Sequence, residues 1–413
     1  MAQVLGVEGV FPYDGDTPSA TRRQARERGL VLLSNPDMLH YGLLPRHPDW
    51  APFLARLRYV VLDELHAYRG VFGTHVALIL RRLLRLARHY GASPQVLAAS
   101  ATIANAREHA EALTGLPFEE LKAQVARTER ELLVLLPKPL DRRGERRRSP
   151  LLEAAYLARR LAEAGLKGLV FAGARKSAEL IARYAAHPLV RPYRAGYTAR
   201  ERRRLEADLK EGRVRVLVST SALELGVDIG ELDAVVLVGY PGSTAAFWQR
   251  AGRAGRGERR ALLVYIPRED PMDEYFLHRP ALLLESPPEE AVADPQNPVL
   301  CPLHLHAAAR EKPLLAEELL CPEARATLKE RNGRFFTPKR NPHREITLRG
   351  LGATFTLRGP DGEVLGYLDE RQAYWEAHPG AIYLHQGESY LVRNVDLARR
   401  EVWLLPALED YYT

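Results

Sequence analysis

The sequence of 413 residues predicts an α/β protein with two parallel-sheet lobes, the first of them incomplete, followed by a helical segment and a small β-rich domain. Short apolar runs alternate with helical patterns as far as residue 270, which is typical of β/α units. Because the runs are apolar on both faces, each strand is expected to be covered on both sides, as in a parallel sheet. A charged stretch at 137–150 that contains three prolines interrupts the alternation once and separates the lobes.

The first lobe is expected over residues 1–128, with apolar strands at 30–33, 58–62 and 95–99. Between the last two strands, apolar residues at helical spacing predict a helix at 75–90. Its other side carries arginines that we interpret as a solvated face, namely Arg81, Arg85 and Arg88.

Four further segments complete the predicted organisation. The second lobe repeats the β/α pattern, and its strands are expected at 168–172, 214–219, 234–238 and 261–266. A winged helix is one form that the helical accessory segment can take. The predicted bounds are 129–150 for the linker, 151–270 for the second lobe, 271–343 for the helical accessory segment and 344–413 for the β-rich accessory domain.

Composition favours a cytoplasmic protein with a polyanionic partner. No apolar run reaches the ~18 residues of a membrane span, so no membrane association is expected. The net charge of +7 favours nucleic acid, although an arginine-rich composition can equally reflect the genome. The cysteines Cys301 and Cys321 agree with a reducing compartment, and with His304 and His306 they fit no zinc template.

The run at 58–62 ends in Asp63-Glu64-Leu65-His66, two carboxylates and a histidine at the carboxyl end of a predicted strand. In open α/β sheets ligands bind at this edge, where a phosphate-bound Mg²⁺ takes one or two carboxylates. Adjacent side chains of a strand point in different directions, so one carboxylate can face the metal and the other an attacking water. The strand at 95–99 delivers Ser100-Ala101-Thr102 to the same edge.

The segment 249–256 carries arginines at three-residue spacing with glycines between them, which suggests close backbone approach to a ligand. Guanidinium groups suit the charge of a transferring phosphoryl group. Together with the two stretches above, this segment resembles motif VI of superfamily 2 DExH helicases, with motifs II and III at 63–66 and 100–102. The resemblance implies two RecA-like lobes that use ATP and Mg²⁺.

By this resemblance Asp63 holds Mg²⁺ through water, Glu64 polarises the attacking water, and His66 belongs to the same catalytic set. Ser100, Ala101 and Thr102 couple hydrolysis to strand movement. In motif VI, the residues that would face the triphosphate are Gln249, Arg253 and Arg256.

Two further segments resemble nucleic-acid-binding motifs of the same helicases. Asn35, Pro36 and Asp37 resemble the start of motif Ib, whereas the residue types alone predict a capped turn before a helix. Segment 219–229 resembles motif V. There the hydroxyl groups of Ser219, Thr220 and Ser221 would hold phosphates of a single strand in the groove between the lobes, and Gly226 and Asp228 would lie near the nucleotide.

Within the superfamily, segments 63–73 and 384–388 look like the Hrq1/YprA (MrfA) group of DNA repair helicases. The resemblance implies 3′-to-5′ unwinding of DNA in the cytoplasm, at the nucleoid. It implies a chain trimmed at both ends, without the cysteine-rich zinc module of its relatives. RNA stays open as a partner, because phosphate contacts carry no sugar identity.

The phosphate-binding sequence G-x-x-x-x-G-K-[ST] does not occur in the chain. We therefore expect exposed apolar strand surface in the first lobe and no significant ATPase activity from the chain alone. Two hypotheses follow. In the first, the chain is a truncated or split product of an ATP-dependent DNA helicase, and a longer reading frame or a complementing N-terminal fragment supplies the missing segment. In the second, it is a non-catalytic nucleic-acid-binding remnant.

Overall fold

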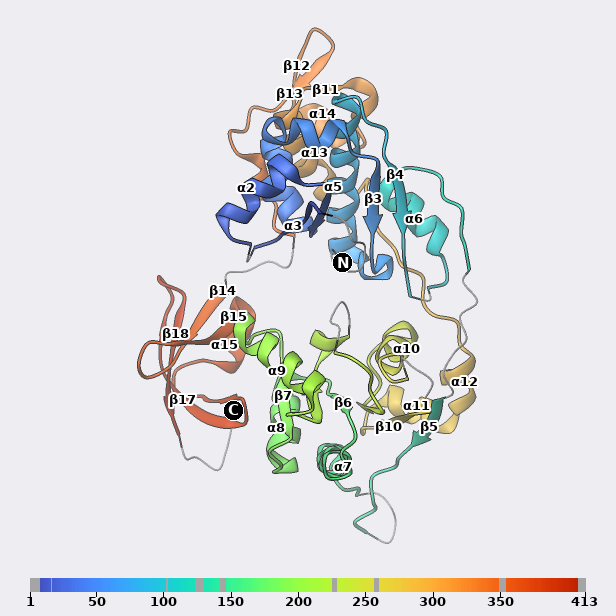
Figure 1. Cartoon of the computed structure of the whole chain (residues 1–413), viewed down its shortest axis with the longest axis vertical. Coiled ribbons are helices and arrows are strands. Elements are labelled where there is room, and N and C mark those ends of the chain that lie inside the picture. The colour runs from blue at the N-terminus through green and yellow to red at the C-terminus, as the bar shows by residue number, and fades with distance from the viewer. Residues whose placement is uncertain are drawn as a thin grey trace. The chain divides into compact units, whose positions relative to one another are not determined.

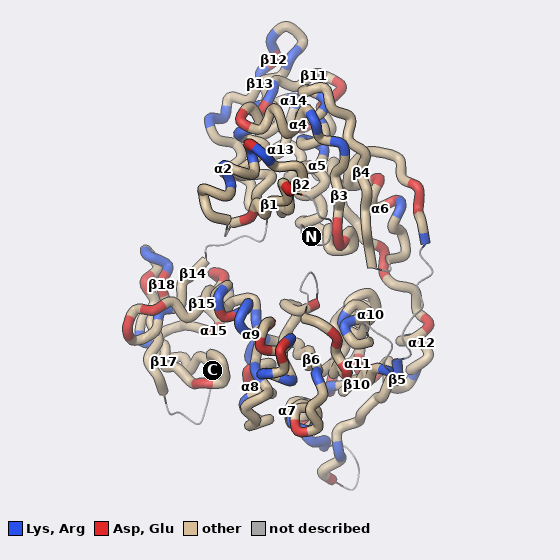
Figure 2. Tube along the Cα trace, in the orientation of Figure 1, with Lys and Arg blue, Asp and Glu red and all other residues tan. Residues whose placement is uncertain are grey.

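The structure is a computed structural model that describes residues 8–15, 17–101, 103–122, 130–141, 146–224, 229–255, 260–348 and 354–407. The chain divides into two compact units (Figure 1). Unit 1 comprises Met1–Lys122 and Glu290–Leu351, and unit 2 comprises Ala123–Glu289 and Gly352–Thr413. Lysine and arginine positions are spread along the chain in both units and interspersed with acidic positions (Figure 2).

Unit 1 contains two pairs of parallel strands. The first pair is β1 (Val10–Tyr13) with β2 (Val31–Ser34), and the second is β3 (Tyr59–Leu62) with β4 (Gln95–Ala98). Among the described residues no strand joins the two pairs. The helices around them are α2 (Ser19–Arg28), α3 (Pro36–Met38), α4 (Ala51–Ala55), α5 (Gly70–His89) and α6 (Ala106–Thr114).

Helix α5 is the centre of unit 1, because it contributes to three apolar clusters at once. The helix predicted at 75–90 is confirmed, but its arginines are not all solvated. Arg85 donates to Glu318 at 2.7 Å, and Arg81 donates to the carbonyl of Ala112 at 2.9 Å. Only Arg88 of the three is exposed. The expectation was wrong because the segments at 106–114 and 308–318 pack against this side of the helix, which local periodicity does not reveal.

The accessory part of unit 1 has the element order of a winged helix. Helix α13 (Leu300–Glu311) is followed by β11 (Leu314–Leu315), a 3₁₀ turn (Ala316–Glu318) and α14 (Pro322–Thr327). The hairpin of β12 (Lys329–Arg331) and β13 (Arg334–Phe336) completes an antiparallel sheet in the order β11-β13-β12.

Cys301 and Cys321 form a disulfide in this region. Both are buried where α13 meets the start of α14, and this proximity is a tertiary contact between residues 20 positions apart. The sequence analysis, which took the two cysteines to agree with a reducing compartment, did not anticipate this disulfide. The neighbouring histidines have other contacts, since His304 bonds to His75 and His306 bonds to Thr327 and Thr337.

A buried polar network connects α5 to α13. Arg82 pairs with the fully buried carboxylate of Glu311 and donates to Nδ1 of His40 at 2.9 Å and Nδ1 of His304 at 3.3 Å. His343 adds a contact of 3.0 Å to Glu311. Burial together with the Arg82 charge lowers the pKa of His40 to about 3, so this ring is neutral at neutral pH.

Unit 2 contains a six-stranded sheet in which every pair is parallel. The strands, in spatial order, are β5 (Arg130–Val134), β10 (Ala261–Ile266), β9 (Ala234–Val238), β6 (Gly168–Phe171), β8 (Val216–Ser219) and β7 (Val190–Tyr193). Apolar clusters cover both faces, and every residue of β6 is buried. This agrees with the parallel sheet that the apolar runs predicted.

The helices of unit 2 begin with α7 (Pro150–Glu163), α8 (Arg175–Ala185) and α9 (Ala199–Glu211). They continue with α10 (Thr244–Ala251), α11 (Pro271–His278) and α12 (Pro280–Glu285). Strands β5 and β7 were not predicted. Strand β5 lies within the segment expected to be a linker, and it forms the edge of the sheet beside β10.

A five-stranded β-rich domain packs on the second lobe within unit 2. Its spatial order is β15 (Val364–Asp369), β14 (Thr354–Arg358), β18 (Glu401–Pro406), β17 (Glu388–Asp396) and β16 (Ile382–His385), with α15 (Glu370–Glu376) between β15 and β16. The fold class is therefore the predicted one, with two RecA-like lobes, helices and a small β-rich domain.

Glu179 on α8 joins the β-rich domain to the second lobe. Its buried carboxylate accepts hydrogen bonds from Tyr197, at 2.6 Å, and from the backbone of Gln386 and Gly387, at 3.2 and 2.7 Å. Arg194 lies 3.3 Å from it. Within the described residues, no helix has the length and apolar character needed to cross a membrane.

Candidate nucleotide and nucleic-acid site

The motif at 63–66 lies at the carboxyl end of β3, as the sequence predicted. Asp63 is exposed, and its Oδ1 accepts the backbone N–H of Glu64 at 2.9 Å. Glu64 has a left-handed backbone conformation, with φ of 53° and ψ of 47°. A non-glycine residue in this region is uncommon and is found at functional sites, where the surrounding structure enforces it.

His66 connects this motif to the end of β4. The imidazole is buried, and its Nδ1 accepts the backbone N–H of Ala101 at 3.1 Å. Ser100 Oγ lies 3.4 Å from the same nitrogen. Because Nδ1 accepts, the ring proton of the neutral form is on Nε2, which lies 3.4 Å from a carboxylate oxygen of Glu64. A chain of contacts thus runs from Glu64 through His66 to residues 100–101.

Backbone bonds fix the relative position of the same two loops. Leu65 donates its N–H to the carbonyl of Ala99 at 2.9 Å, and Ala99 donates to Leu62 at 2.8 Å. The sequence prediction that β3 and β4 deliver their motifs to one edge is confirmed, since the two strands are parallel and adjacent. Thr102 lies outside the described residues.

Asn35 begins helix α3 at the end of β2. Its side chain accepts the N–H of Met38 at 2.9 Å, which is the capping role predicted from the residue types alone. Pro36 occupies the first turn, and Asp37 adds an acidic group there. The side-chain oxygen of Asn35 is occupied by this cap. Contacts of the segment with phosphate would therefore come from other groups at the start of α3.

Motif V follows β8 in unit 2. Ser219 is fully buried, and its hydroxyl has no hydrogen-bond partner among the described residues. Thr220 is half-buried and Ser221 is exposed at the start of the 3₁₀ turn Ser221–Leu223. Only the last two of the three hydroxyl residues therefore reach the surface in this structure.

Helix α10 carries the start of motif VI, and two acceptors cap its N-terminus. Ser243 accepts the N–H of Ala246 at 3.1 Å, while the carboxylate of Glu289 accepts from Thr244 and Ala245 at 2.6 and 2.9 Å. Burial raises the pKa of Glu289, but the backbone hydrogen bonds outweigh it and the net shift is downward. The negative charge also suits the positive end of the helix dipole.

Glu224 connects motif V to motif VI, a role that the sequence analysis missed. Its carboxylate accepts from Arg250 Nε at 2.9 Å, and its backbone carbonyl accepts from Arg253 Nε, also at 2.9 Å. Arg253 is buried, and the Arg250 guanidinium lies 5.4 Å from the centre of the Phe171 ring. The available signal was the position of Glu224 inside motif V, five residues after Ser219.

Gln249 is half-buried on the last turn of α10. The remaining predicted site residues of this unit, Gly226, Asp228 and Arg256, lie outside the described residues.

The residues at the end of β3 fit a hydrated magnesium ion. One oxygen of the exposed Asp63 carboxylate takes the Glu64 N–H, which leaves the other for a metal-bound water. When bound, the ion would supply positive charge against the nucleotide phosphates. Among the described residues no three His, Cys, Asp or Glu side chains gather into a metal site.

Lobes built on parallel strands, carboxylates at a strand end and arginines at the end of α10 define the class of DEAD/DEAH-box helicases. The family described as "DEAD/DEAH box helicase" matches residues 2–110, and "Helicase conserved C-terminal domain" matches residues 152–258.

The chain is 36% identical to the ATP-dependent helicase YprA of Bacillus subtilis over 98% of its length, and 31% identical to hrq1 of Schizosaccharomyces pombe over 95%. It spans 57% and 40% of these relatives, respectively. The solved structure of the DUF1998 helicase MrfA bound to DNA and AMPPNP matches 99% of the chain with a TM-score of 0.91 and 35% identity, and the chain covers 61% of it. The chain belongs to the superfamily 2 helicases, in the group of Hrq1, YprA and MrfA.

Proposed function

We propose that the chain is the motor part of an ATP-dependent DNA helicase that moves 3′ to 5′ on a single strand and serves DNA repair. The observation that carries the proposal is the hydrogen bond between His66 and Ala101. A helicase must convert a change at the nucleotide into movement. This bond joins His66, whose other ring nitrogen lies 3.4 Å from the Glu64 carboxylate, to the end of the next strand. The named relatives support the same reaction, since YprA and hrq1 are described as ATP-dependent helicases.

In the proposed reaction Asp63 orients Mg²⁺ through a water, and Glu64 accepts a proton from the attacking water. Gln249, Arg253 and Arg256 of the second lobe stabilise charge on the phosphates. Arg253 is held by the Glu224 carbonyl, so we expect the ligand to compete with that contact.

The DNA strand is proposed to contact both units. Residues 35–37 supply the start of α3, and Thr220 and Ser221 supply hydroxyl groups. Ser219 can take part only after its loop opens, because the structure buries its hydroxyl. MrfA was solved bound to DNA, which favours DNA over RNA as the partner. A nucleoid location in the cytoplasm follows from this partner.

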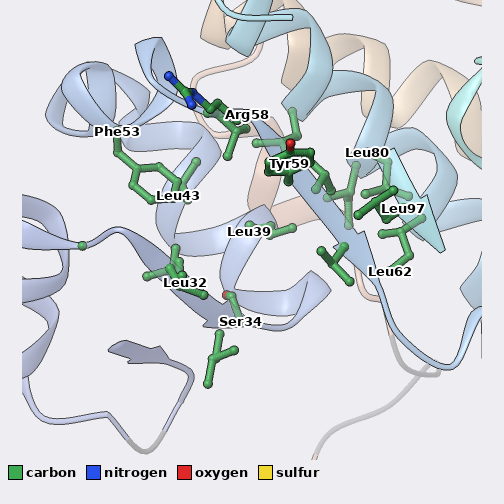
Figure 3. A pocket seen from close by; sticks show the side chains of 18 of the residues that line it. Leu32, Ser34, Leu39, Leu43, Phe53, Arg58, Tyr59, Leu62, Leu80 and Leu97 are labelled. Atoms are coloured by element: carbon green, nitrogen blue, oxygen red, sulfur yellow. The ribbon is translucent and has the colours of Figure 1, made fainter. Parts of the chain in front are cut away.

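A cavity in unit 1 supports the proposal that a complementing N-terminal segment completes the first lobe. The cavity has a volume of about 1740 Å³ and lies between β2 and β3 (Figure 3). Its wall is mainly apolar and includes Leu32, Leu39, Leu43, Phe53, Leu80 and Leu97. Tyr59 and Val61 on β3 are 57% and 64% exposed. Such strand surface is expected to be covered in a parallel sheet.

The cavity also reaches Ser34 and Asp63, at the edge where the nucleotide is expected. A strand that entered here would bring the loop after it close to Asp63. We propose that this loop supplies the phosphate cradle, and that the 413-residue chain has no significant ATPase activity without it.

DNA-stimulated ATP hydrolysis tests the function. We would compare the 413-residue chain, a chain extended at its N-terminus with the corresponding segment of YprA, and the extended chain with Glu64→Gln. The proposal expects turnover only in the extended chain with Glu64 intact. Absence of turnover in both, with DNA binding retained, would identify the chain as a non-catalytic remnant. Turnover by the short chain would refute the argument from the missing phosphate loop.

A further inference from the structure

The hairpin of β12 and β13 extends away from the rest of unit 1 (Figure 1). Its two-residue turn is Asn332-Gly333, and both residues have left-handed φ values, of 52° and 70°. This is the pattern of a type I′ turn, which matches the twist of the strands and gives a well-defined hairpin. The side chains near the turn therefore have fixed positions relative to one another.

Arg331 and Arg334 lie directly opposite each other across this hairpin. Like charges directly opposite in an antiparallel pair destabilise it. Both side chains are exposed, and neither has an ion-pair partner among the described residues of the chain. Nothing in the packing of the hairpin requires two arginines here.

Lys329 extends the same charged face. It lies two residues before Arg331, and side chains at this spacing point to the same side of a strand. The acidic Glu330 is opposite Phe335 instead, 3.8 Å from Arg325. The positive charges lie along both arms of the hairpin (Figure 2). We call Lys329, Arg331 and Arg334 the hairpin basic face.

We propose that the hairpin basic face binds the phosphate backbone of duplex DNA. A repulsive arginine pair on a rigid, exposed hairpin is relieved when a polyanion lies across it, and guanidinium groups suit phosphate oxygens. Lys329 and Arg331 are ~7 Å apart along the strand, a spacing comparable with that of successive phosphates on one DNA strand. The inference rests on the proposed DNA helicase function and assigns a contact surface outside its motifs.

The experiment measures duplex DNA binding by fluorescence anisotropy at several salt concentrations, using the full chain and its Arg331→Gln/Arg334→Gln variant. We expect the variant to bind about tenfold more weakly at physiological salt. The magnitude of the slope of log K against log salt concentration should fall by up to about two, one for each phosphate contact removed. Its thermal midpoint should be unchanged or raised, because the repulsion between the two arginines is removed.

Arg88→Gln/Arg107→Gln is the matched control, since it removes two exposed arginines from the same unit. It should lower affinity and slope less than the hairpin variant. Equal effects from both variants, or a fall in the thermal midpoint of the hairpin variant, would overturn the proposal.

Failure of the hairpin proposal can be separated from failure of the proposed function. If the full chain binds duplex DNA and the hairpin variant binds equally well, only the hairpin proposal is wrong. If the full chain binds no DNA, both are wrong. Polyglutamate serves as a second probe. Tighter binding of polyglutamate than of DNA, lost in the variant, would assign the face to an acidic protein and also overturn the proposal.

Discussion

The backbone N–H of Ala101 donates a 3.1 Å hydrogen bond to Nδ1 of His66. The same imidazole presents Nε2 to Glu64 at 3.4 Å. The hydrogen bond to Ala101 orients the ring at Nδ1, and the Glu64 carboxylate lies close to the opposite nitrogen. In the proposed motor we expect a change at Glu64 to reach the end of β4 through this ring.

Replacing His66 with alanine should uncouple hydrolysis from strand movement in the extended chain. Losing the hydrogen bond to Ala101 removes about 1–1.5 kcal/mol that stabilises the coupled arrangement of the two loops. The amount of DNA unwound per ATP hydrolysed should therefore fall about tenfold. The measurement compares unwinding of a labelled duplex with phosphate release under the same conditions. His89→Ala on the exposed end of α5 is the control, and an equal loss from both variants would contradict the coupling role.

Glu224 should hold Arg250 and Arg253, two arginines of motif VI, in place. Glu224→Ala removes the carboxylate partner of Arg250 but leaves the carbonyl that binds Arg253. We therefore expect a loss of roughly tenfold in kcat for ATP in the extended chain, with DNA affinity unchanged. Glu231→Ala, an exposed acidic residue of the same unit, is the control. An unchanged kcat for Glu224→Ala would show that Arg250 needs no such support.

Glu179 should make one of the largest single contributions to the stability of unit 2. Its buried carboxylate accepts hydrogen bonds from Tyr197 and the backbone at 386–387, and it forms an ion pair with Arg194. Glu179→Ala leaves the Arg194 charge buried without its carboxylate, which typically costs about 3–5 kcal/mol. Urea unfolding gives this value, with the exposed Glu163→Ala as a control that should leave the midpoint unchanged. Equal midpoints for the two variants would refute the prediction.

The strand-end placement of Asp63 and Ser100 was predictable because it depends on local patterns. An apolar run fixes a strand, and the parallel arrangement then brings the ends of neighbouring strands together. Glu179 and Glu224 were not predictable in the same way. The partners of Glu179 are as many as 208 residues away in the chain, and those of Glu224 as many as 29.

The same limit explains the other differences. Arg85 is covered by α13 and the segment after it, which lie more than 200 residues later in the chain. Local sequence patterns around Arg85 therefore predicted a solvated side chain. The pairing of Cys301 with Cys321 depends on how α13 meets α14. Strand β5 was missed because its apolar run, at 132–136, directly precedes the charged, proline-containing stretch and was assigned with it to the linker. Sequence patterns therefore predicted the elements and the motifs, but not the side chains that hold them together.

Acid should destabilise the protein well above the pH at which carboxylates protonate. Burial lowers the pKa of His40 and of His385 to about 3. The nearby positive charge adds to this effect, from Arg82 at His40 and from Arg194 at His385. The unfolded chain binds these protons near pH 6.5, whereas the folded chain does not, so stability is complete above pH 6.5 and falls towards pH 3. Between pH 7.5 and 5.0 each histidine should account for a loss of about 2 kcal/mol.

Urea unfolding at several pH values measures this loss, and the two units allow it to be assigned. His40→Gln should flatten the pH dependence of unit 1 and His385→Gln that of unit 2, because glutamine does not titrate. The exposed His278→Gln should leave both curves unchanged. If the variants lose stability equally at every pH and keep the wild-type slope, the buried rings are not the groups that titrate. A slope reduced by the matching variant would establish that His40 and His385 contribute to the acid limit of their units, alongside buried histidines such as His304, whose pKa burial also lowers.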